Sequence, residues 1–477
     1  MLLVHPVHEV VRQIPVLIGS LVLGSATGNP MWTVVGIALI VAYGLARWFT
    51  TTYRIGPDDV QLRSGVLRRN VLSLPRNRIR SVSTDARLLH RLLGLTVLKV
   101  STGQEASGDT AFELDAVAAA EVAQLRSILL AESLAVPDPV DAPGRVLARW
   151  QPSWLRYSPL TFTGLAMIVA ALGVITQSGV PDALRDSSLV EAGEAAARDL
   201  GVAAVVAVGV IVVLLASVAL SVTQSLVTYG NLVLRRDAEV LHLSHGLIRV
   251  REHTFDMRRL RGGSLREPLL VRLFGGARLD AVMTGVAGAG EASQLLPACP
   301  RATAQAVLID LIDQPDAVTG PLTVHGPVAT RRRWTRALVV PVLAALALAV
   351  WGAAPLWAWV VLVAGTAFSA YLAFDRARSL GHRVGDGWLV ARSGSLTRRR
   401  DCVAAAGIVG WTVRQTLFQR RAGVATLIAA TAAGVKRYEL LDVPADLAWA
   451  IAAATSPWVG VGVDRVAAVP GQAGKPE

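Results

Sequence analysis

Residues 88–95 of the chain read LLHRLLGL, and their spacing recurs in residues 269–276 (LLVRLFGG) and residues 417–424 (LFQRRAGV). In each stretch a leucine, an arginine and a glycine stand three residues apart. An upstream glycine recurs with the same offsets, 181 and 329 positions after its first occurrence. Because solenoid units have only about 20 to 50 residues, this longer period predicts tandem whole domains. We expect structural roles for the residues of this repeat signature, which are Gly65, Leu88, Arg91, Gly94, Gly246, Leu269, Arg272, Gly275, Gly394, Leu417, Arg420 and Gly423.

The composition argues against an ordinary soluble protein. Hydrophobic residues make up 53% of the 477 residues, the mean hydropathy is +0.47, and 17% of the residues are charged. A typical soluble domain has about 25% charged residues. The net charge of +12 suits either nucleic acid or an anionic membrane surface, and the hydropathy favours the membrane. Two cysteines, Cys299 and Cys402, are too few for a disulfide framework.

Long apolar segments predict transmembrane hairpins. Six such segments fall into three pairs, which predict hairpins at residues 10–50, 157–227 and 334–375. The first segment, Ile14–Ala26, is short and holds Pro15, so an interfacial helix is an alternative for it. The predicted hairpin loops hold two arginines, Arg185 and Arg198, and the other basic residues lie on the opposite side of the spans. The positive-inside rule then places both termini and all polar blocks in the cytoplasm.

The polar blocks after the hairpins have the pattern of β-rich domains that end in a helix. In the first block, the Ser64-Gly65 turn predicts a β-hairpin, and the alternating residues 96–100 predict a strand. Apolar residues at helical spacing from Leu114 to Leu129 predict the closing helix, with Asp115 as its N-cap. The other blocks are expected to end in helices at residues 301–312 and 445–454. The expected domains are 51–134, 228–314 and 380–455, with linkers at 135–156 and 315–333 and a flexible tail at 456–477.

Short motifs of the first block follow a known pattern. They are Tyr53-Arg54, Arg63-Ser64-Gly65, Ser73-Leu74-Pro75, Arg78-Ile79-Arg80-Ser81-Val82 and Leu89-His90-Arg91-Leu92-Leu93-Gly94-Leu95. Together they resemble the bacterial pleckstrin-homology (PH) domain of YdbS- and YdbT-like membrane proteins. The third block has Ala404 in place of the proline, and the second block has Asp256 there.

This resemblance implies a strongly bent antiparallel sheet capped by a C-terminal helix, and it implies no particular ligand. The expected molecule therefore has six transmembrane helices in three pairs, alternating with three α+β PH-like domains, in a bacterial plasma membrane.

Arginines of the first block form the most informative polar cluster. Strand alternation would place Arg76, Arg78 and Arg80 in one row. Because a basic residue near an anionic leaflet can gain about 1 kcal/mol, we expect contacts with anionic lipid head groups or an acidic partner. An ordinary positively charged cytoplasmic face is the alternative, and nucleic acid is disfavoured because few aromatic residues accompany the arginines. The candidate binding residues are Arg68, Arg69, Arg76, Arg78 and Arg80.

No residue pattern predicts catalysis, a cofactor or a metal site. His242 and His245 stand three residues apart in an alternating segment, which would point their side chains to opposite faces. Coupled transporters typically hold ionisable residues at mid-membrane depth, and the centres of the predicted spans hold none. We expect a non-enzymatic membrane scaffold in cell-envelope function or stress resistance, with a membrane-protein partner or a second copy of the chain. The alternative is a transporter or export component whose PH-like domains regulate a pore.

Overall fold

The computed structural model describes residues 52–56, 59–64, 70–75, 81–86, 94–101, 112–122, 124–125, 144–161, 163, 166–170, 201–284, 293–352 and 354–459, together with residues 31, 34 and 38. The chain forms two compact units. Unit 1 comprises Met1–Trp150, Leu226–Arg259 and Gly285–Ala287, and unit 2 comprises Gln151–Ser225, Leu260–Thr284 and Gly288–Glu477. The expected first hairpin, residues 10–50, lies outside the described residues apart from residues 31, 34 and 38.

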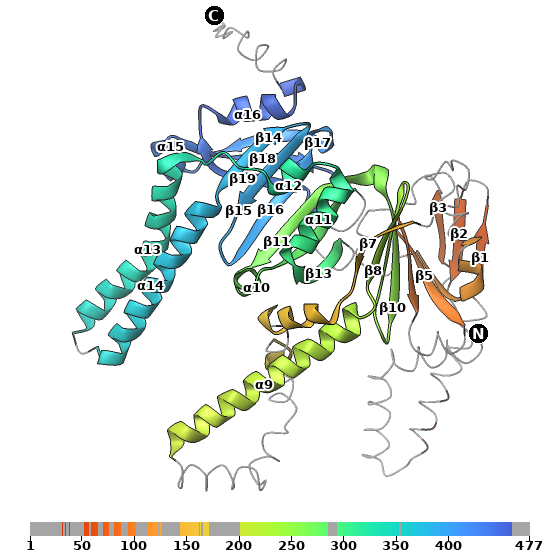
Figure 1. The fold of residues 1–477 in the computed structure, drawn as a ribbon, viewed down its shortest axis with the longest axis horizontal. Coiled ribbons are helices and arrows are strands. Elements are labelled where there is room, and N and C mark those ends of the chain that lie inside the picture. The colour runs from red at the N-terminus through yellow and green to blue at the C-terminus, as the bar shows by residue number, and fades with distance from the viewer. Residues whose placement is uncertain are drawn as a thin grey trace, which may run out of the picture. The chain divides into compact units, whose positions relative to one another are not determined.

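Unit 1 contains two antiparallel sheets (Figure 1). One sheet has the strand order β1-β2-β3, and a seven-stranded sheet has the order β6-β5-β4-β10-β9-β8-β7. The strands are β1 (Thr52–Ile55), β2 (Asp59–Ser64), β3 (Asn70–Pro75), β4 (Ser81–Ala86), β5 (Leu95–Ser101), β6 (Phe112–Ala118), β7 (Arg145–Arg149), β8 (Val233–Asp237), β9 (Val240–His245) and β10 (Val250–Asp256). The expected strand at residues 96–100 is confirmed as β5.

Unit 2 also contains two antiparallel sheets, of six and three strands, with the orders β13-β12-β11-β16-β15-β14 and β17-β18-β19. The strands are β11 (Leu260–Pro268), β12 (Gly276–Met283), β13 (Gln294–Pro300), β14 (Gly381–Gly385), β15 (Trp388–Ser393), β16 (Thr397–Ala404), β17 (Ile408–Arg414), β18 (Val424–Thr431) and β19 (Arg437–Pro444). The helices outside the apolar spans are α10 (Leu269–Leu273), α11 (Arg301–Ile312), α12 (Pro315–Thr319), α15 (Leu417–Arg421) and α16 (Ala448–Thr455), with short 3-10 turns at η3 (Pro152–Tyr157), η4 (Pro159–Thr161) and η6 (Ala405–Gly407).

The main core of unit 2 lies between its two sheets. Leu389 and Val403 of the six-stranded sheet pack in one cluster with Leu427 and Leu440 of the three-stranded sheet. Each of these four side chains exposes at most 1% of its surface. Helix α11 coincides with the expected closing helix of the second block, and it buries Leu308. The expected closing helix of the third block begins three residues later than predicted, as α16.

Strand pairing crosses the boundaries between the expected domains. β4 of the first block pairs with β10 of the second, and β11 of the second block pairs with β16 of the third. Phe255 lies opposite Ser81 in the first junction, and Val403 lies opposite Gly262 in the second. Residues of the second and third blocks can be given first-block numbers by subtracting 181 and 329, respectively. In these numbers, both junctions place position 74 opposite position 81. The second block therefore contributes its strands to two different sheets, and both junctions have the same register.

Three of the described helices are long and apolar enough to cross a membrane. They are Ala207–Tyr229 within α9 (Val202–Tyr229), Gly326–Trp351 (α13) and Leu356–Ser379 (α14). These helices correspond to the second helix of the expected second hairpin and to both helices of the third. The first helix of the second hairpin lies mostly outside the described residues.

The expected closing helix of the first block begins later than predicted. The segment from Leu114 was expected to begin this helix, with Asp115 as its cap, but Phe112–Ala118 forms strand β6 and pairs with β5. Helical residues follow the strand at positions 119–122, 124 and 125. The sequence FELDAVA alternates between apolar and acidic residues over its first four positions, a two-residue period that suits a strand. Strand β7 also forms inside the expected linker 135–156, because its backbone adds to the edge strand β8. Helix α12 similarly lies inside the expected linker 315–333.

The N-terminal end of α13 is anchored to the third block. Asp442 on β19 exposes 2% of its side chain and forms ion pairs with Arg332 at 3.2 Å and with Arg333 at 2.6 Å. Beside it, the Nδ1 of His325 lies 2.6 Å from the carbonyl oxygen of Leu441, and its Nε2 lies 3.0 Å from the Nδ1 of His382. Since a carbonyl can only accept, the His325 Nδ1 donates to it. Of the two facing nitrogens, His325 Nε2 and His382 Nδ1, one must carry a proton and the other must not, so this arrangement cannot hold two protonated imidazoles.

The repeat-signature glycines fall into two physical classes. Gly94, Gly275 and Gly423 have φ angles of 65°, 73° and 66°, and an added Cβ at each would meet no atom within 4 Å. Gly246 and Gly394 have φ angles of 109° and 99°, and an added Cβ would lie 2.0 Å and 2.1 Å from a backbone carbonyl oxygen. The first class therefore needs glycine for its backbone conformation alone, and the second class also needs it for space.

This difference predicts unequal effects of alanine substitutions. Gly423→Ala should lower the free energy of unfolding by about 1–2 kcal/mol, the cost of the left-handed conformation for an L-residue. Gly394→Ala should cost more, because the new Cβ also collides with the carbonyl oxygen of Thr397. Thermal and denaturant unfolding of the full chain in detergent would measure both variants. Equal losses would show that the collision is relieved without cost.

The histidine pair predicts a dependence of stability on pH. Burial lowers the pKa of His382 to about 4, and burial also lowers the pKa of His325. In the unfolded chain both histidines titrate near a pKa of about 6.5. The unfolded state therefore binds more protons than the folded state between about pH 6.5 and pH 4, so stability should fall as the pH falls through this window.

The His382→Asn variant is the matched control, because an amide can still donate a hydrogen bond but does not titrate. Melting temperatures of the full chain between pH 7.5 and pH 4 should fall more steeply for the wild type than for this variant. Parallel curves would contradict the assignment of this pH dependence to the histidine pair.

Candidate functional site

The five arginines predicted to bind lipid or a partner, Arg68, Arg69, Arg76, Arg78 and Arg80, lie outside the described residues, so their role stays a prediction. Their second-block equivalents are partly engaged in ion pairs. Arg249, the equivalent of Arg68, pairs with Asp85 across the junction of β4 and β10. Burial alone would raise the pKa of Asp85, but the hydrogen bond and charge of Arg249 lower it overall. Arg259, the equivalent of Arg78, lies 3.5 Å from Asp256.

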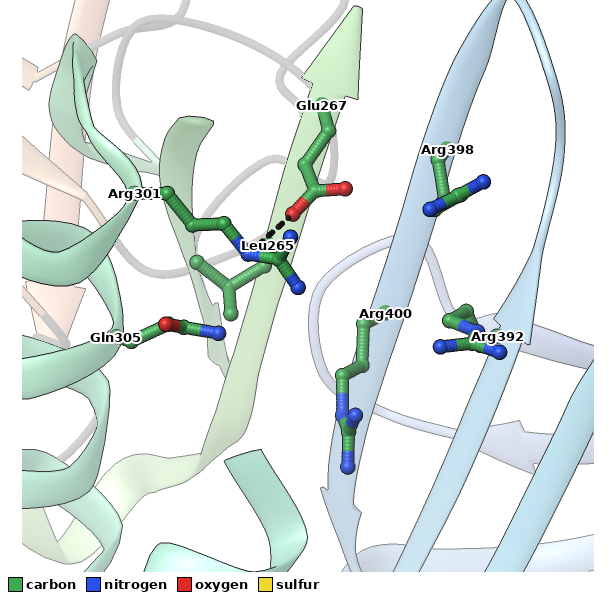
Figure 2. A pocket seen from close by; sticks show the side chains of 7 residues that line it. All are labelled: Leu265, Glu267, Arg301, Gln305, Arg392, Arg398 and Arg400. Atoms are coloured by element: carbon green, nitrogen blue, oxygen red, sulfur yellow. Dashed lines mark ion pairs between the residues drawn. The ribbon is translucent and has the colours of Figure 1, made fainter. Parts of the chain in front are cut away.

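A second group of arginines lines a pocket in unit 2. The pocket lies at the junction of β11 and β16. Figure 2 shows its lining side chains gathered over the strands and the start of α11. They are Leu265, Glu267, Arg301, Gln305, Arg392, Arg398 and Arg400.

Strand register explains why these side chains share one face. Arg398 and Arg400 stand two residues apart on β16, so they point to the same side of the sheet. Arg400 lies directly opposite Leu265 of β11 and opposite Arg392 of β15. Glu267 lies opposite Arg398 in the next row. Arg399 points to the other face, where it pairs with Asp401 at 3.3 Å, and so it takes no part in the pocket.

Two of the four pocket arginines have carboxylate partners. Arg301, the first residue of α11, pairs with Glu267 at 3.0 Å. Arg398 pairs at 2.7 Å with Asp375, near the C-terminal end of α14. Asp375 also pairs at 2.8 Å with Arg272, a residue of the repeat signature. The same carboxylate thus holds an arginine of the second block and an arginine of the third.

The other two arginines are held by neutral groups. Arg400 donates to the carbonyl oxygens of Ala317 at 3.0 Å and Gly320 at 2.9 Å. Arg392 donates to the carbonyl oxygens of Ser379 at 2.9 Å and Arg378 at 3.2 Å. These carbonyls orient the guanidinium groups but leave their charges uncompensated. The pocket therefore holds an excess of positive charge.

The pKa directions reflect this excess. Burial, followed by the charges of Arg398 and Arg400, lowers the pKa of Arg392. Burial also lowers the pKa of Arg400. Both groups stay protonated at neutral pH because an arginine starts from a pKa above 12, so the cost of burying their charges remains. An anion bound in the pocket would reduce this cost.

The pocket has no group suited to covalent chemistry. Cys402 lies two residues after Arg400 on the same face of β16, but burial raises the pKa of its thiol to about 12, and its Sγ lies 3.2 Å from the carbonyl oxygen of Ala317. A neutral buried thiol is a poor nucleophile. Within the described part of the chain, no cluster of three or more His, Cys, Asp or Glu side chains could hold a metal ion. What the pocket can do chemically is bind a phosphate or carboxylate through arginine forks.

The remaining signature residues have local structural roles. Leu269 and Leu417 begin the short helices α10 and α15, and Arg420 lies within α15. Gly65, Leu88 and Arg91 lie outside the described residues. The run Arg398–Arg400 is evident in the sequence, whereas Arg301 and Arg392 were not identified as site residues. Arg392 belongs to the Arg-Ser-Gly motif, and its pairing with Arg400 across the β15–β16 ladder could be found only from the strand register.

The comparisons with known proteins identify the family. A family model described as the bacterial PH domain matches residues 11–133 and 336–454, each of which contains an expected hairpin and the block that follows it. No curated protein and no solved structure matches the chain. The matched segments together cover just over half of the 477 residues, and the antiparallel strands of the third block followed by helix α16 agree with this match. The chain therefore belongs to the bacterial PH domain family.

Proposed function

We propose that this protein is a non-enzymatic scaffold of the bacterial plasma membrane, in which cytoplasmic PH-like domains dock anionic phospholipid head groups. The observation that carries the proposal is the pocket where Arg392 and Arg400 are oriented by carbonyl oxygens and have no carboxylate partner among their described contacts. The Nε and Nη2 atoms of each guanidinium already donate to these carbonyls, and the N–H groups that remain on each suit the oxygens of a phosphate.

The pocket is close to a membrane-spanning helix in the sequence and in the fold. Arg392 donates to the last two residues of α14, and Arg398 pairs with Asp375 one turn earlier. Because α14 is apolar enough to cross a membrane, its charged end is where lipid head groups would be encountered. This position favours a lipid phosphate as the occupant.

The apolar helices favour a scaffold over a transporter. α9 carries no charged residue along Val202–Tyr229, and the charged residues of α14 lie in its last two turns. Moving an ion or a charged substrate usually requires ionisable groups at mid-membrane depth. Anchoring and helix packing need only apolar residues.

Anionic lipid binding can be tested with the full chain in an uncharged detergent. The probe is dihexanoyl phosphatidylglycerol, and dihexanoyl phosphatidylcholine is the zwitterionic comparison. Arg392→Gln and Arg400→Gln should each weaken phosphatidylglycerol binding about tenfold, since a charge-assisted hydrogen bond contributes about 1.5–3 kcal/mol. Binding of the wild type should also weaken with added salt.

Arg437→Gln is the matched control for net charge. Arg437 lies on β19 with 66% of its side chain exposed, outside the pocket lining. Arg400→Lys keeps the positive charge but loses the planar guanidinium, so its affinity for phosphatidylglycerol should lie between those of the wild type and Arg400→Gln. Melting temperatures would show that each variant is folded. Equal affinity for both lipids, or equal losses in Arg437→Gln and Arg400→Gln, would overturn the lipid assignment.

The cytoplasmic orientation predicts a labelling pattern in intact cells. Cysteine placed at Ser187, in the expected loop of the second hairpin, should react from outside with a membrane-impermeant maleimide. Cysteine placed at Ser64, at the end of β2, should react only after permeabilisation. The native Cys299 and Cys402 each expose 0% of their surface, so the unmodified chain measures the background. The reverse pattern would place the domains outside the cell.

A further inference from the structure

Each three-stranded sheet ends in a strand with a single neighbour among the described residues. In unit 1, β3 pairs with β2 and has no described strand on its other side. In unit 2, β17 pairs with β18 and likewise has no described strand on its other side. An edge strand exposes unpaired backbone N–H and C=O groups that can pair with another strand.

The internal repeat shows what such strands pair with. β3 (Asn70–Pro75) is equivalent to β10 and β16, which stand 181 and 329 positions later. β17 (Ile408–Arg414) is the third-block equivalent of β4 in the first block and β11 in the second, because the three strands overlap when their residue numbers are converted to first-block numbers. Since β10 pairs with β4 and β16 pairs with β11, every other strand of these two types is paired with a strand of the complementary type from the adjacent block.

The shared register predicts how β17 and β3 would match. Both existing junctions place position 74 opposite position 81, and Gly410 is the third-block equivalent of position 81. Leu74 would therefore lie opposite Gly410, and Leu72 would lie opposite Thr412. Pro75, which cannot donate a backbone hydrogen bond, falls just outside the ladder, as do its equivalents Asp256 and Ala404 in the existing junctions.

We propose that β17 of one copy of this chain pairs antiparallel with β3 of a second copy, in the register of the two internal junctions. Among the described strands, each chain offers one unpaired edge of each type, so copies would join head to tail through a heterologous interface. The two strands are suited to each other in composition: NVLSLP carries no charge and IVGWTVR carries only its terminal arginine. Val71 exposes 54% of its surface, which such pairing would reduce.

Disulfide trapping between two single-cysteine chains tests the interface directly. Leu72→Cys and Thr412→Cys would each be made in the full chain with Cys299→Ala and Cys402→Ala, and the two variants, carrying tags of different size, would be co-expressed and oxidised in membranes. The proposal expects a cross-linked heterodimer that contains both tags. Leu72→Cys co-expressed with Arg414→Cys is the matched control for register, because residue 414 lies on the same face of β17 but two positions along the strand. It should cross-link much less.

A second measurement does not depend on the geometry of a disulfide. Val71→Lys should weaken self-association at least tenfold, as measured by light scattering of the detergent-solubilised chain over a range of concentrations, because an edge lysine opposes strand addition. Val146→Lys on the edge strand β7, where Val146 is 46% exposed, should leave self-association unchanged. Melting temperatures would establish that both variants are folded.

Three outcomes would overturn the proposal. The first is the absence of a heterodimer together with a monomeric wild type at all concentrations. The second is cross-linking of equal extent with Arg414→Cys. The third is a Leu72→Cys, Thr412→Cys double variant whose disulfide forms only inside single chains. Lipid binding at the arginine pocket is measured in a separate experiment. The outcome of the cross-linking and self-association experiments therefore does not decide whether the pocket binds lipid.

Discussion

The antiparallel ladders between successive blocks are the constraint on which the rest of the structure depends. Each ladder covers two sheet edges at once, one from each block, and so satisfies backbone groups that would otherwise be exposed. The register of the ladders is fixed by burial on the sheet faces. Leu265 is buried on the pocket face of the β11–β16 ladder, and Val403 is buried on the opposite face, in the core between the two sheets, with 2% and 1% of their surfaces exposed. A slip of one residue would move each of these side chains to the other face. The shared register of the two junctions follows from this common pattern of burial.

Local periodicity predicted the elements whose partners lie nearby in the sequence, such as β5 and α11. It was wrong for β6 because Leu114, Val117 and Ala118 suit a helical face while the alternation of Phe112 to Asp115 suits a strand. The ladder with β5 decides between them, and no pattern within the segment shows that pairing. Pairing between blocks was also absent from the sequence-based prediction, since Phe255 and Ser81 are more than 150 positions apart. The repeat revealed equivalent blocks but not which strands they would share.

In the candidate site, too, the run of arginines is a local feature of the sequence, whereas the contacts among the arginines depend on strand pairing. The charge run Arg398–Arg400 was visible in the sequence, yet strand alternation sends Arg399 to Asp401 on the opposite face. The two arginines that remain form a pocket only because the ladders bring Arg392 beside Arg400 and Glu267 beside Arg398. The candidate binding arginines predicted from the sequence lie in the first block, so the sequence did not locate this pocket, and only the strand register shows which arginines face one another.

The pocket and the end of α14 share their hydrogen-bonding groups, which links lipid binding to the position of the helix. Arg392 satisfies carbonyl oxygens at the C-terminal end of α14, where a helix leaves four carbonyls without intrahelical donors and where positive charge is favoured. Arg398 holds Asp375 on the same helix. An anion that draws either guanidinium toward itself must compete with these contacts, so its binding free energy includes the cost of loosening the helix end. By linkage, any displacement of α14 that releases Arg392 or Arg398 would raise the affinity of the pocket for an anion by the same free energy.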